Sequence, residues 1–231
     1  MTPIYKPKGA AKEYGDYAIN IYTGCSHRCE YCFAPGVLRK DKEEFHTHVI
    51  PREGILEALK NQLERNEIRG NTIHLCFTCD PYPTGYNTIM TRRIIKILKS
   101  YGNHVQLLTK SAETRDFDIL DEDDAFGVTL DGADNNAYSA SVNDRINALK
   151  LAHKRGIKTW VSFEPVVNTR RVLRLIRIVA PFVDKVKIGK LNHVESDTDW
   201  KKFGIDAENL CKELKLDYYI KDALRKEMEQ K

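Results

Sequence analysis

Residues 18–35 read Ala-Ile-Asn-Ile-Tyr-Thr-Gly-Cys-Ser-His-Arg-Cys-Glu-Tyr-Cys-Phe-Ala-Pro. The first six are mainly apolar and predict a short buried strand, which runs directly into a loop with three cysteines. These are Cys25, Cys29 and Cys32, and they fall within eight residues. Cysteines this crowded in a cytosolic chain indicate metal or redox chemistry rather than a disulfide framework. The stretch therefore predicts a strand that ends at a metal or redox site.

The same alternation of strand and helix continues along the chain. Short apolar strands are expected at Ala18–Thr23, Thr72–Phe77, Val105–Thr109, Phe126–Leu130, Thr159–Phe163 and Lys185–Ile188, with a seventh candidate at Tyr218–Ile220. Apolar stripes at helical spacing lie between most of them and begin near Ile55, Ile94, Val142, Val172 and Trp200. Repeated strand–helix–strand units imply parallel strands with right-handed crossovers. About six units are fewer than the eight of a closed barrel, so we expect an α/β fold: an open, partial parallel β/α barrel.

Composition sets broad limits. The 231 residues favour a single domain over 1–231, with a core at about 16–193 and a C-terminal extension at about 194–231. Hydrophobic residues make up 42% and charged residues 30%, as in ordinary globular proteins. No stretch approaches the roughly 20 apolar residues of a membrane span, and residues 1–8 lack the apolar core of a signal peptide. We therefore expect a cytoplasmic protein with no membrane partner.

Polar and sulfur-bearing side chains follow the expected strands where each strand ends. Cys79 and Asp80 follow the second strand, Lys110 the third and Glu164 the fifth, while Thr129 lies at the end of the fourth. Because the carboxyl ends of parallel strands meet at one rim of such a barrel, we expect these groups to converge there.

Two kinds of metal site fit the cysteine loop. Three thiolates at this spacing can bind three irons of a 4Fe–4S cluster and leave the fourth iron open to an external ligand. A structural zinc site needs four ligands, and His27, Cys76 or Cys79 could supply the fourth. A zinc-stabilised binding protein with structural cysteines is therefore the alternative to a cluster enzyme.

The motifs resemble those of a known family. A first strand followed by Gly-Cys-Ser-His-x-Cys-x-Tyr-Cys, with an aromatic residue before the third cysteine, resembles the signature of the radical S-adenosylmethionine (radical SAM) enzymes. More narrowly, the chain resembles the spore photoproduct lyase-related branch, in this loop and in three later motifs: Asp80-Pro81-Tyr82, Leu108-Thr109-Lys110-Ser111 and Phe163-Glu164-Pro165. The resemblance extends from about Asn20 to Lys190. It implies a radical SAM domain in which a 4Fe–4S cluster cleaves SAM reductively and the resulting 5′-deoxyadenosyl radical abstracts hydrogen from an organic substrate.

The resemblance also suggests roles for single residues. Cys25, Cys29 and Cys32 would ligate the cluster. Tyr31 would lie beside the adenine of SAM, Lys110 would meet its carboxylate, and Thr129 would help to hold it. We also expect Asp80 in the cofactor site, although a carboxylate before a proline has a structural alternative as a turn former.

Glu164 and Cys79 are the candidate catalytic residues. Glu164 emerges from an apolar strand, so its carboxylate must be paired, solvated or shifted in pKa, and we expect it to orient a ligand or contact substrate. Cys79 could return a hydrogen atom to a substrate radical, whereas Cys76 and Cys211 are most simply core residues. His27 and His193 could be ligands, although a hydrogen-bonded loop histidine is commoner.

The sequence gives only partial information on the substrate and the partner proteins. The lyase-like branch suggests a nucleobase or nucleic-acid substrate, but a net charge of +4 does not support a nucleic-acid partner by itself. The basic helix faces at Arg92–Lys99 and Arg170–Arg177 are expected to be solvated. The resemblance also implies an electron donor such as flavodoxin or ferredoxin.

Overall fold

The computed structural model describes residues 2–66, 68–192 and 196–229, which include an eight-stranded sheet in the order β1 to β8. Its strands are β1 (Ile4–Tyr5), β2 (Tyr17–Ile19), β3 (Thr72–Leu75), β4 (His104–Thr109), β5 (Ala125–Thr129), β6 (Lys158–Phe163), β7 (Lys185–Ile188) and β8 (Asp217–Ile220). Strand β1 pairs antiparallel with β2, and every later neighbour pairs in parallel. The expected open parallel β/α architecture is therefore confirmed, and the seventh candidate strand is β8.

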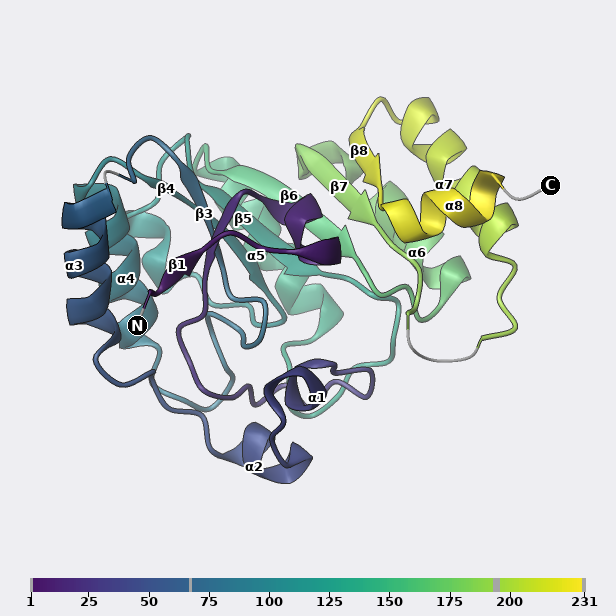
Figure 1. Cartoon of the computed structure of the whole chain (residues 1–231). Coiled ribbons are helices and arrows are strands. Elements are labelled where there is room, and N and C mark those ends of the chain that lie inside the picture. Colours follow the sequence, from purple (N-terminus) through teal and green to yellow (C-terminus); the bar gives the residue numbers. More distant parts are fainter. Residues whose placement is uncertain (1, 67, 193–195, 230–231) are drawn as a thin grey trace.

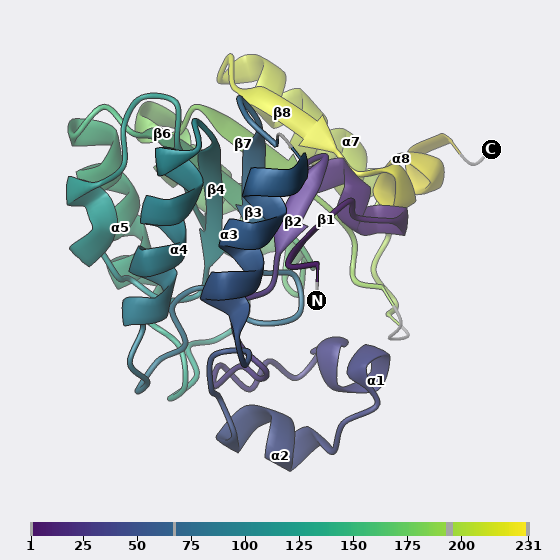
Figure 2. The same cartoon turned by 60° about the vertical axis from the view of Figure 1, so that its left-hand side comes forward.

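Helices and short 3-10 turns connect the strands. They are η1 (Gly9–Tyr14), α1 (Ala34–Leu38), α2 (Lys42–Thr47), α3 (Ile55–Asn66), α4 (Ile89–Ser100), η2 (Arg115–Asp118), α5 (Val142–Lys154), α6 (Thr169–Val179), η3 (Ala180–Phe182), α7 (Trp200–Glu213) and α8 (Asp222–Glu229). Helices α3, α4 and α5 lie side by side along one face of the sheet (Figure 2). Side-chain caps fix where the later helices begin, because Ser141 accepts a hydrogen bond from the Asp144 amide and Asn168 from the Arg171 amide.

The two faces of the sheet differ in chemistry. Alternate strand residues such as Leu107, Phe126 and Val161 are fully buried in the hydrophobic core. The opposite face carries His74 and Lys187, and the N-terminal segment with β1 and η1 crosses it (Figure 1). The structure therefore buries polar side chains beneath a segment whose fold the sequence motifs did not predict.

The last part of the chain extends the same sheet. Strand β8 continues the parallel series beside β7, and α7 and α8 pack against each other next to it (Figure 1). The division into a core and a C-terminal extension stays a prediction, and its boundary at His193 lies outside the described residues. Within those residues, no helix is long and apolar enough to cross a membrane.

Candidate active site

The three-cysteine loop runs from β2 to α1 and is held by α2. The Cys25 amide donates to the Phe45 carbonyl at 3.1 Å, and Nδ1 of His46 lies 2.7 Å from the Cys25 carbonyl oxygen. A Cβ atom on Gly24 would overlap the carbonyl oxygens of Phe45 and His48. Only glycine permits so close an approach of two backbones, so the glycine before the first cysteine has a steric function.

The three thiols are free and partly exposed. Burial raises the pKa of Cys25, Cys29 and Cys32, so each needs a cation to become a thiolate ligand at neutral pH. Sulfur ligands of one tetrahedral zinc lie about 3.8 Å apart. The sulfur atoms of these three described residues do not all lie within 4.8 Å of one another. The loop therefore suits a cluster with several metal atoms better than a single zinc.

Asp80 connects this loop to the end of β4. Its Oδ1 accepts hydrogen bonds from the Thr109 hydroxyl at 2.6 Å and the Tyr82 amide at 2.8 Å. Its Oδ2 accepts from the Lys110 amide at 3.0 Å and lies 3.2 Å from Nδ1 of His27. Burial raises the pKa of Asp80, but His27 and these hydrogen bonds outweigh it and hold the pKa below its usual range. The Asp80 carboxylate thus connects His27 of the three-cysteine loop to the end of β4, where Lys110 follows.

Lys110 belongs to a buried group that we call the Lys110 network (Tyr31, Lys110 and Asp131). Both the Lys110 ammonium and the Tyr31 hydroxyl donate to Oδ2 of Asp131, and the ammonium lies 5.2 Å from the centre of the Tyr31 ring. Burial raises the pKa of Asp131, but the Lys110 charge and the hydrogen bonds from Lys110, Tyr31 and the Ala133 amide together outweigh this and lower the pKa below its usual range. Because Lys110 also lowers the pKa of Cys29 against the effect of burial, the network lies beside the cysteine loop.

An unpartnered donor lies next to this network. Arg145 on α5 is 3% exposed and donates from one terminal nitrogen to the Thr129 carbonyl, but its Nε has no partner among the described residues. Burial lowers the pKa of Arg145, while the charges of Asp131, Tyr31 and Cys29 act in the opposite direction. The Ser26 hydroxyl, within the cysteine loop, is also buried without a described partner. Unpaired buried donors on both sides of the thiols suit a polar cofactor.

Glu164 lies in a separate group, the Glu164 network (Tyr14, Ser162, Glu164 and Lys221). The Lys221 ammonium is 2.6 Å from Oε2 of Glu164, and the Tyr14 hydroxyl donates to the same oxygen. The hydroxyl also lies 3.2 Å from the Ser162 hydroxyl. Lys221 is 3% exposed and meets a second carboxylate, that of Glu13, at 3.1 Å. The predicted carboxylate is therefore paired by residues from both ends of the chain.

The structure thus joins Tyr31 and Lys110 through Asp131, and Asp80 joins Lys110 to His27 of the cysteine loop. Thr129 is bound by Arg145 through its carbonyl oxygen. Sequence reasoning missed Asp131, although it follows the fourth expected strand, and applying the strand-end rule there would have found it. Arg145 carried no such signal, because a cation within a helix usually faces solvent. Tyr14 had none that we recognise, since no motif covers residues 1–15.

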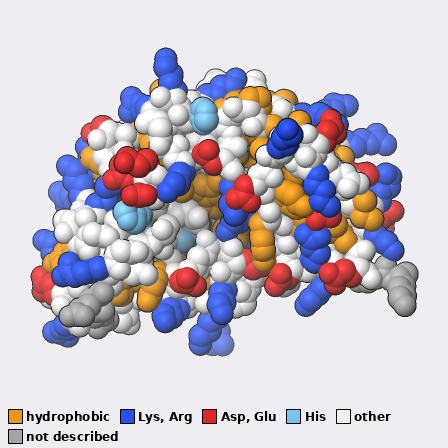
Figure 3. Space-filling view, turned by 90° about the horizontal axis from the view of Figure 1, so that it is seen from above, with side chains coloured by type: hydrophobic (Ala, Val, Ile, Leu, Met, Phe, Trp, Pro, Cys, Tyr) orange, Lys and Arg blue, Asp and Glu red, His pale blue; other side chains and the backbone are white. Residues whose placement is uncertain are grey.

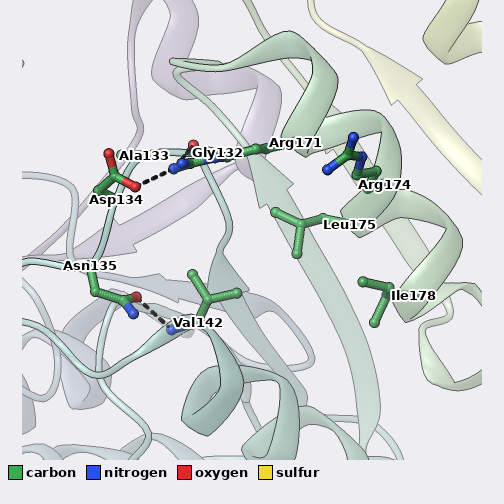
Figure 4. A pocket seen from close by; sticks show the side chains of 9 residues that line it. All are labelled: Gly132, Ala133, Asp134, Asn135, Val142, Arg171, Arg174, Leu175 and Ile178. Atoms are coloured by element: carbon green, nitrogen blue, oxygen red, sulfur yellow. Dashed lines mark hydrogen bonds and ion pairs between the residues drawn. The ribbon is translucent and has the colours of Figure 1, made fainter.

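A hollow of about 280 Å³ lies outside this rim, between the loop after β5 and helix α6 (Figure 4). Arg171 points across it and pairs with Asp134, while Leu175 and Ile178 form its apolar wall. None of the cluster cysteines lines it. The hollow is therefore not formed by the cysteine loop.

Comparison with known proteins agrees with this geometry. The family model of the radical SAM superfamily matches residues 19–170. The chain belongs to the radical SAM superfamily. It is 28% identical over 162 residues to an uncharacterised protein of Methanocaldococcus jannaschii, covering 65% of this chain and 60% of that protein. It is 32% identical over 121 residues to an uncharacterised protein of Mycobacterium bovis, covering 47% of this chain and 33% of that one. The chain thus spans less than two thirds of the length of these relatives.

Solved structures share the fold at low sequence identity. Spore photoproduct lyase complexed with dinucleoside spore photoproduct gives a TM-score of 0.71 at 13% identity, covering 94% of this chain and 79% of that one. Streptococcus suis SuiB bound to S-adenosylmethionine gives a TM-score of 0.64 at 11% identity, covering 88% and 49%. These likenesses confirm the predicted radical SAM fold.

Family membership decides between the two alternatives left open by the cysteines. Membership of the radical SAM superfamily implies a 4Fe–4S cluster and S-adenosylmethionine as cofactors. A zinc-stabilised binding protein is not supported, because His27 is engaged by Asp80 and Thr84 and Cys79 by the Tyr22 amide.

Proposed function

We propose that Cys25, Cys29 and Cys32 bind the 4Fe–4S cluster and that the Lys110 network binds SAM beside it. The observation that carries this proposal is the connection through Asp80, which holds the cysteine loop against the strand end that presents Lys110. When bound, the reduced cluster and SAM supply a 5′-deoxyadenosyl radical, which abstracts a hydrogen atom from the substrate.

The charges of the Lys110 network match the polar end of SAM. The methionyl part of SAM is a zwitterion, with an ammonium and a carboxylate on one carbon. Lys110 can pair with the carboxylate while Asp131 accepts from the ammonium, so neither side chain is left as an unpaired buried charge. The Arg145 Nε offers a further donor, and the Tyr31 ring offers a flat wall for the adenine. Thr129 completes this side of the site.

Two further residues act on the substrate in this proposal. Cys79 is half-buried and lies near Cys25, because the charge of Cys79 adds to the effect of burial in raising the pKa of Cys25. In this proposal, Cys79 donates a hydrogen atom to a substrate radical. Glu164 orients the substrate from another part of the rim, where its carboxylate pairs with Lys221 at 2.6 Å. The external electron comes from a small redox protein such as flavodoxin or ferredoxin.

We propose a nucleobase, in a nucleotide or an unpaired strand, as the substrate. Tyr138 is 50% exposed, and the Arg28 guanidinium of the cysteine loop lies 5.0 Å from its ring centre. Tyr86 is also exposed and lies close enough to Arg28 to affect its pKa. Exposed aromatic rings with an arginine can stack an unpaired base. The net charge is only +4, and the face in Figure 3, which is seen from above and lies away from α1 and α2, carries Asp and Glu among its Lys and Arg side chains. Stacking rather than phosphate attraction would therefore carry the affinity. The lyase-like neighbour holds a dinucleoside, which is consistent with this class.

The cluster assignment is tested by anaerobic reconstitution. The wild-type chain should take up about four irons and four sulfides and should release 5′-deoxyadenosine from SAM with dithionite. The Cys25→Ala/Cys29→Ala/Cys32→Ala variant should do neither. Cys211→Ala, which removes a buried thiol from α7, is the matched control and should retain both. Equal iron and sulfide in the triple variant and the wild type would overturn the assignment.

The substrate class is tested by fluorescence anisotropy of the reconstituted protein with labelled single-stranded DNA, duplex DNA and an unrelated peptide. Single-stranded DNA should bind best, and Tyr138→Ala should weaken it by about 1–3 kcal/mol, or roughly 5- to 150-fold. Ile205→Ala, an equally isolated exposed residue on α7, should change it less than about 2-fold. Preferential binding of the peptide would instead favour a peptide-modifying enzyme.

A further inference from the structure

The turn after β3 contains two cysteines in a Cys-x-x-Cys spacing, Cys76-Phe77-Thr78-Cys79. Cys76 has a φ of 72°, in the left-handed region that residues other than glycine rarely adopt. This conformation turns the chain sharply as the strand ends, so residues 76 and 79 belong to one tight turn. Cys76 is only 6% exposed, whereas Cys79 is half-buried.

The turn is held rigidly by the end of β2 and the residues that follow it. The hydrogen bonds run from the Cys76 amide to the Ile19 carbonyl at 2.9 Å, from the Phe77 and Thr78 amides to Oδ1 of Asn20 at 2.8 and 2.9 Å, and from the Tyr22 amide to Sγ of Cys79 at 3.4 Å. Asn20 is itself fixed, because its Nδ2 donates to the Tyr5 hydroxyl at 2.8 Å. The two cysteines are therefore presented in a fixed relative position.

The two sulfurs are neighbours within this turn. Each thiol acts on the pKa of the other, as two groups a short distance apart do. Burial alone would raise the pKa of Cys79, but Cys76 and the Tyr22 amide, whose nitrogen is 3.4 Å from the Cys79 sulfur, leave it below its ordinary value, while burial raises the pKa of Cys76. A cysteine with a lowered pKa beside a second thiol is the arrangement of redox-active Cys-x-x-Cys pairs.

We propose that Cys76 and Cys79 are a redox-active dithiol that closes to a disulfide by exchange with a low-molecular-weight disulfide such as oxidised glutathione. The more exposed Cys79 thiolate attacks one sulfur of the oxidant, forms a mixed disulfide and releases one thiolate. Cys76 then loses its proton and attacks the Cys79 sulfur, which releases the second thiolate. The two cysteines lose two electrons, the oxidant gains them, and the Cys76 proton passes to a released thiolate.

Disulfide formation between Cys76 and Cys79 would affect the proposed reaction, because the pair lies near the cysteine loop. Tyr22, which donates to Cys79, lies three residues before Cys25 in the same segment. If Cys79 is the hydrogen-atom donor of the proposed function, closing the disulfide removes its S–H bond and stops that donation. This consequence rests on the proposed function, whereas disulfide formation itself does not.

The test uses the anaerobically reconstituted protein incubated with oxidised glutathione, then alkylated, digested with trypsin and analysed by mass spectrometry. The tryptic peptide 70–92 contains both cysteines and is expected mainly as an internal disulfide, lighter by two hydrogens and carrying no alkyl groups. In Cys76→Ser, Cys79 should instead accumulate as a mixed disulfide with glutathione. Cys211, in its own peptide, should be alkylated throughout after denaturation and reports on unspecific oxidation.

Two results would overturn the proposal of a redox-active dithiol. One is complete alkylation of both cysteines in the wild-type peptide, which decides the matter even if the variant does not fold. The other is equal accumulation of the glutathione adduct in the wild type and in Cys76→Ser, because Cys76 would then not resolve it. Cluster content and SAM cleavage are measured on the reduced sample of the same preparation. Their loss refutes the proposed function, and their presence without the disulfide refutes only the dithiol.

Discussion

Replacing Lys110 with alanine tests the placement of the SAM site. Lys110 is 13% exposed at its side chain and forms an ion pair with Asp131, which is 5% exposed. In Lys110→Ala, Asp131 keeps the Tyr31 hydroxyl and the Ala133 amide at 3.1 Å as donors but loses its only described cationic partner. SAM would then bring its carboxylate toward that of Asp131 with no Lys110 ammonium to pair with either.

The size of the effect follows from the burial of the pair. A hydrogen bond to a charged group contributes about 1.5–3 kcal/mol when it is shielded from water, which corresponds to roughly a 10- to 150-fold loss of affinity. We expect Lys110→Ala to weaken SAM binding within this range, measured by isothermal titration of the anaerobic, reconstituted protein without reductant. Iron and sulfide content should stay at the wild-type level, because Lys110 ligates no metal in the proposal.

The matched control removes two cations from the outer layer. Arg174 and Arg177 on α6 are exposed, and Arg177 makes a surface ion pair with Glu213 at 3.1 Å. Exposed pairs contribute about 0–1 kcal/mol to stability, so Arg174→Ala/Arg177→Ala should bind SAM within about 2-fold of wild type. Damage to the double variant, together with normal binding by Lys110→Ala, would show that the active face is misplaced. A ligand surface on α6 would then replace the rim.

Three further perturbations test neighbouring parts of the site. Gly24→Ala should lower iron content to below half of wild type, because its methyl group overlaps backbone oxygens of the α2 region, whereas Gly36→Ala, with open space around it, should not. Because the pKa of Asp80 is lowered in the folded protein, its carboxylate stabilises the fold above about pH 4, and this stabilisation is lost as the pH falls further. Urea unfolding between pH 3 and 7 should therefore show a smaller pH dependence of stability for Asp80→Asn than for wild type. Glu164→Gln should lower stability by about 1–3 kcal/mol, because Lys221 loses a charged partner; an unchanged melting temperature in calorimetry would contradict the buried pair.

The order of the parallel strands could be predicted from the sequence because each strand is a short apolar run bounded by polar or glycine residues. Lys185–Ile188 coincides with β7, and the other expected strands overlap β2 to β6 and β8. The strand expected at Ala18–Thr23 is shorter in the structure and ends at Ile19, because the following residues bind the turn after β3 through Asn20. That contact spans 57 residues, and no local periodicity contains it.

Outside the cysteine loop, the sequence could predict site residues only where they lie at the end of an expected strand. Strand ends locate Lys110 and Thr129 because parallel strands of one sheet end at one rim. They do not show that Tyr31 and Lys110 share one carboxylate, since the shared partner, Asp131, is 100 residues from Tyr31. Arg145 was hidden for another reason: a cation within a helix usually indicates a solvated face, and here burial near the thiols reverses that expectation.

Glu164 was singled out by its place after a strand, but the sequence did not show which groups compensate its carboxylate. A carboxylate that emerges from an apolar strand must be compensated, but its compensating groups lie 150 residues upstream, at Tyr14, and 57 residues downstream, at Lys221. Both lie outside residues 19–170, which match the family model. The terminal segments therefore supply the hydrogen-bonding partners of a side chain that belongs to the family core. A substrate that reaches Glu164 must compete with a phenol and an ammonium, so a polar, hydrogen-bonding group fits there better than an apolar one.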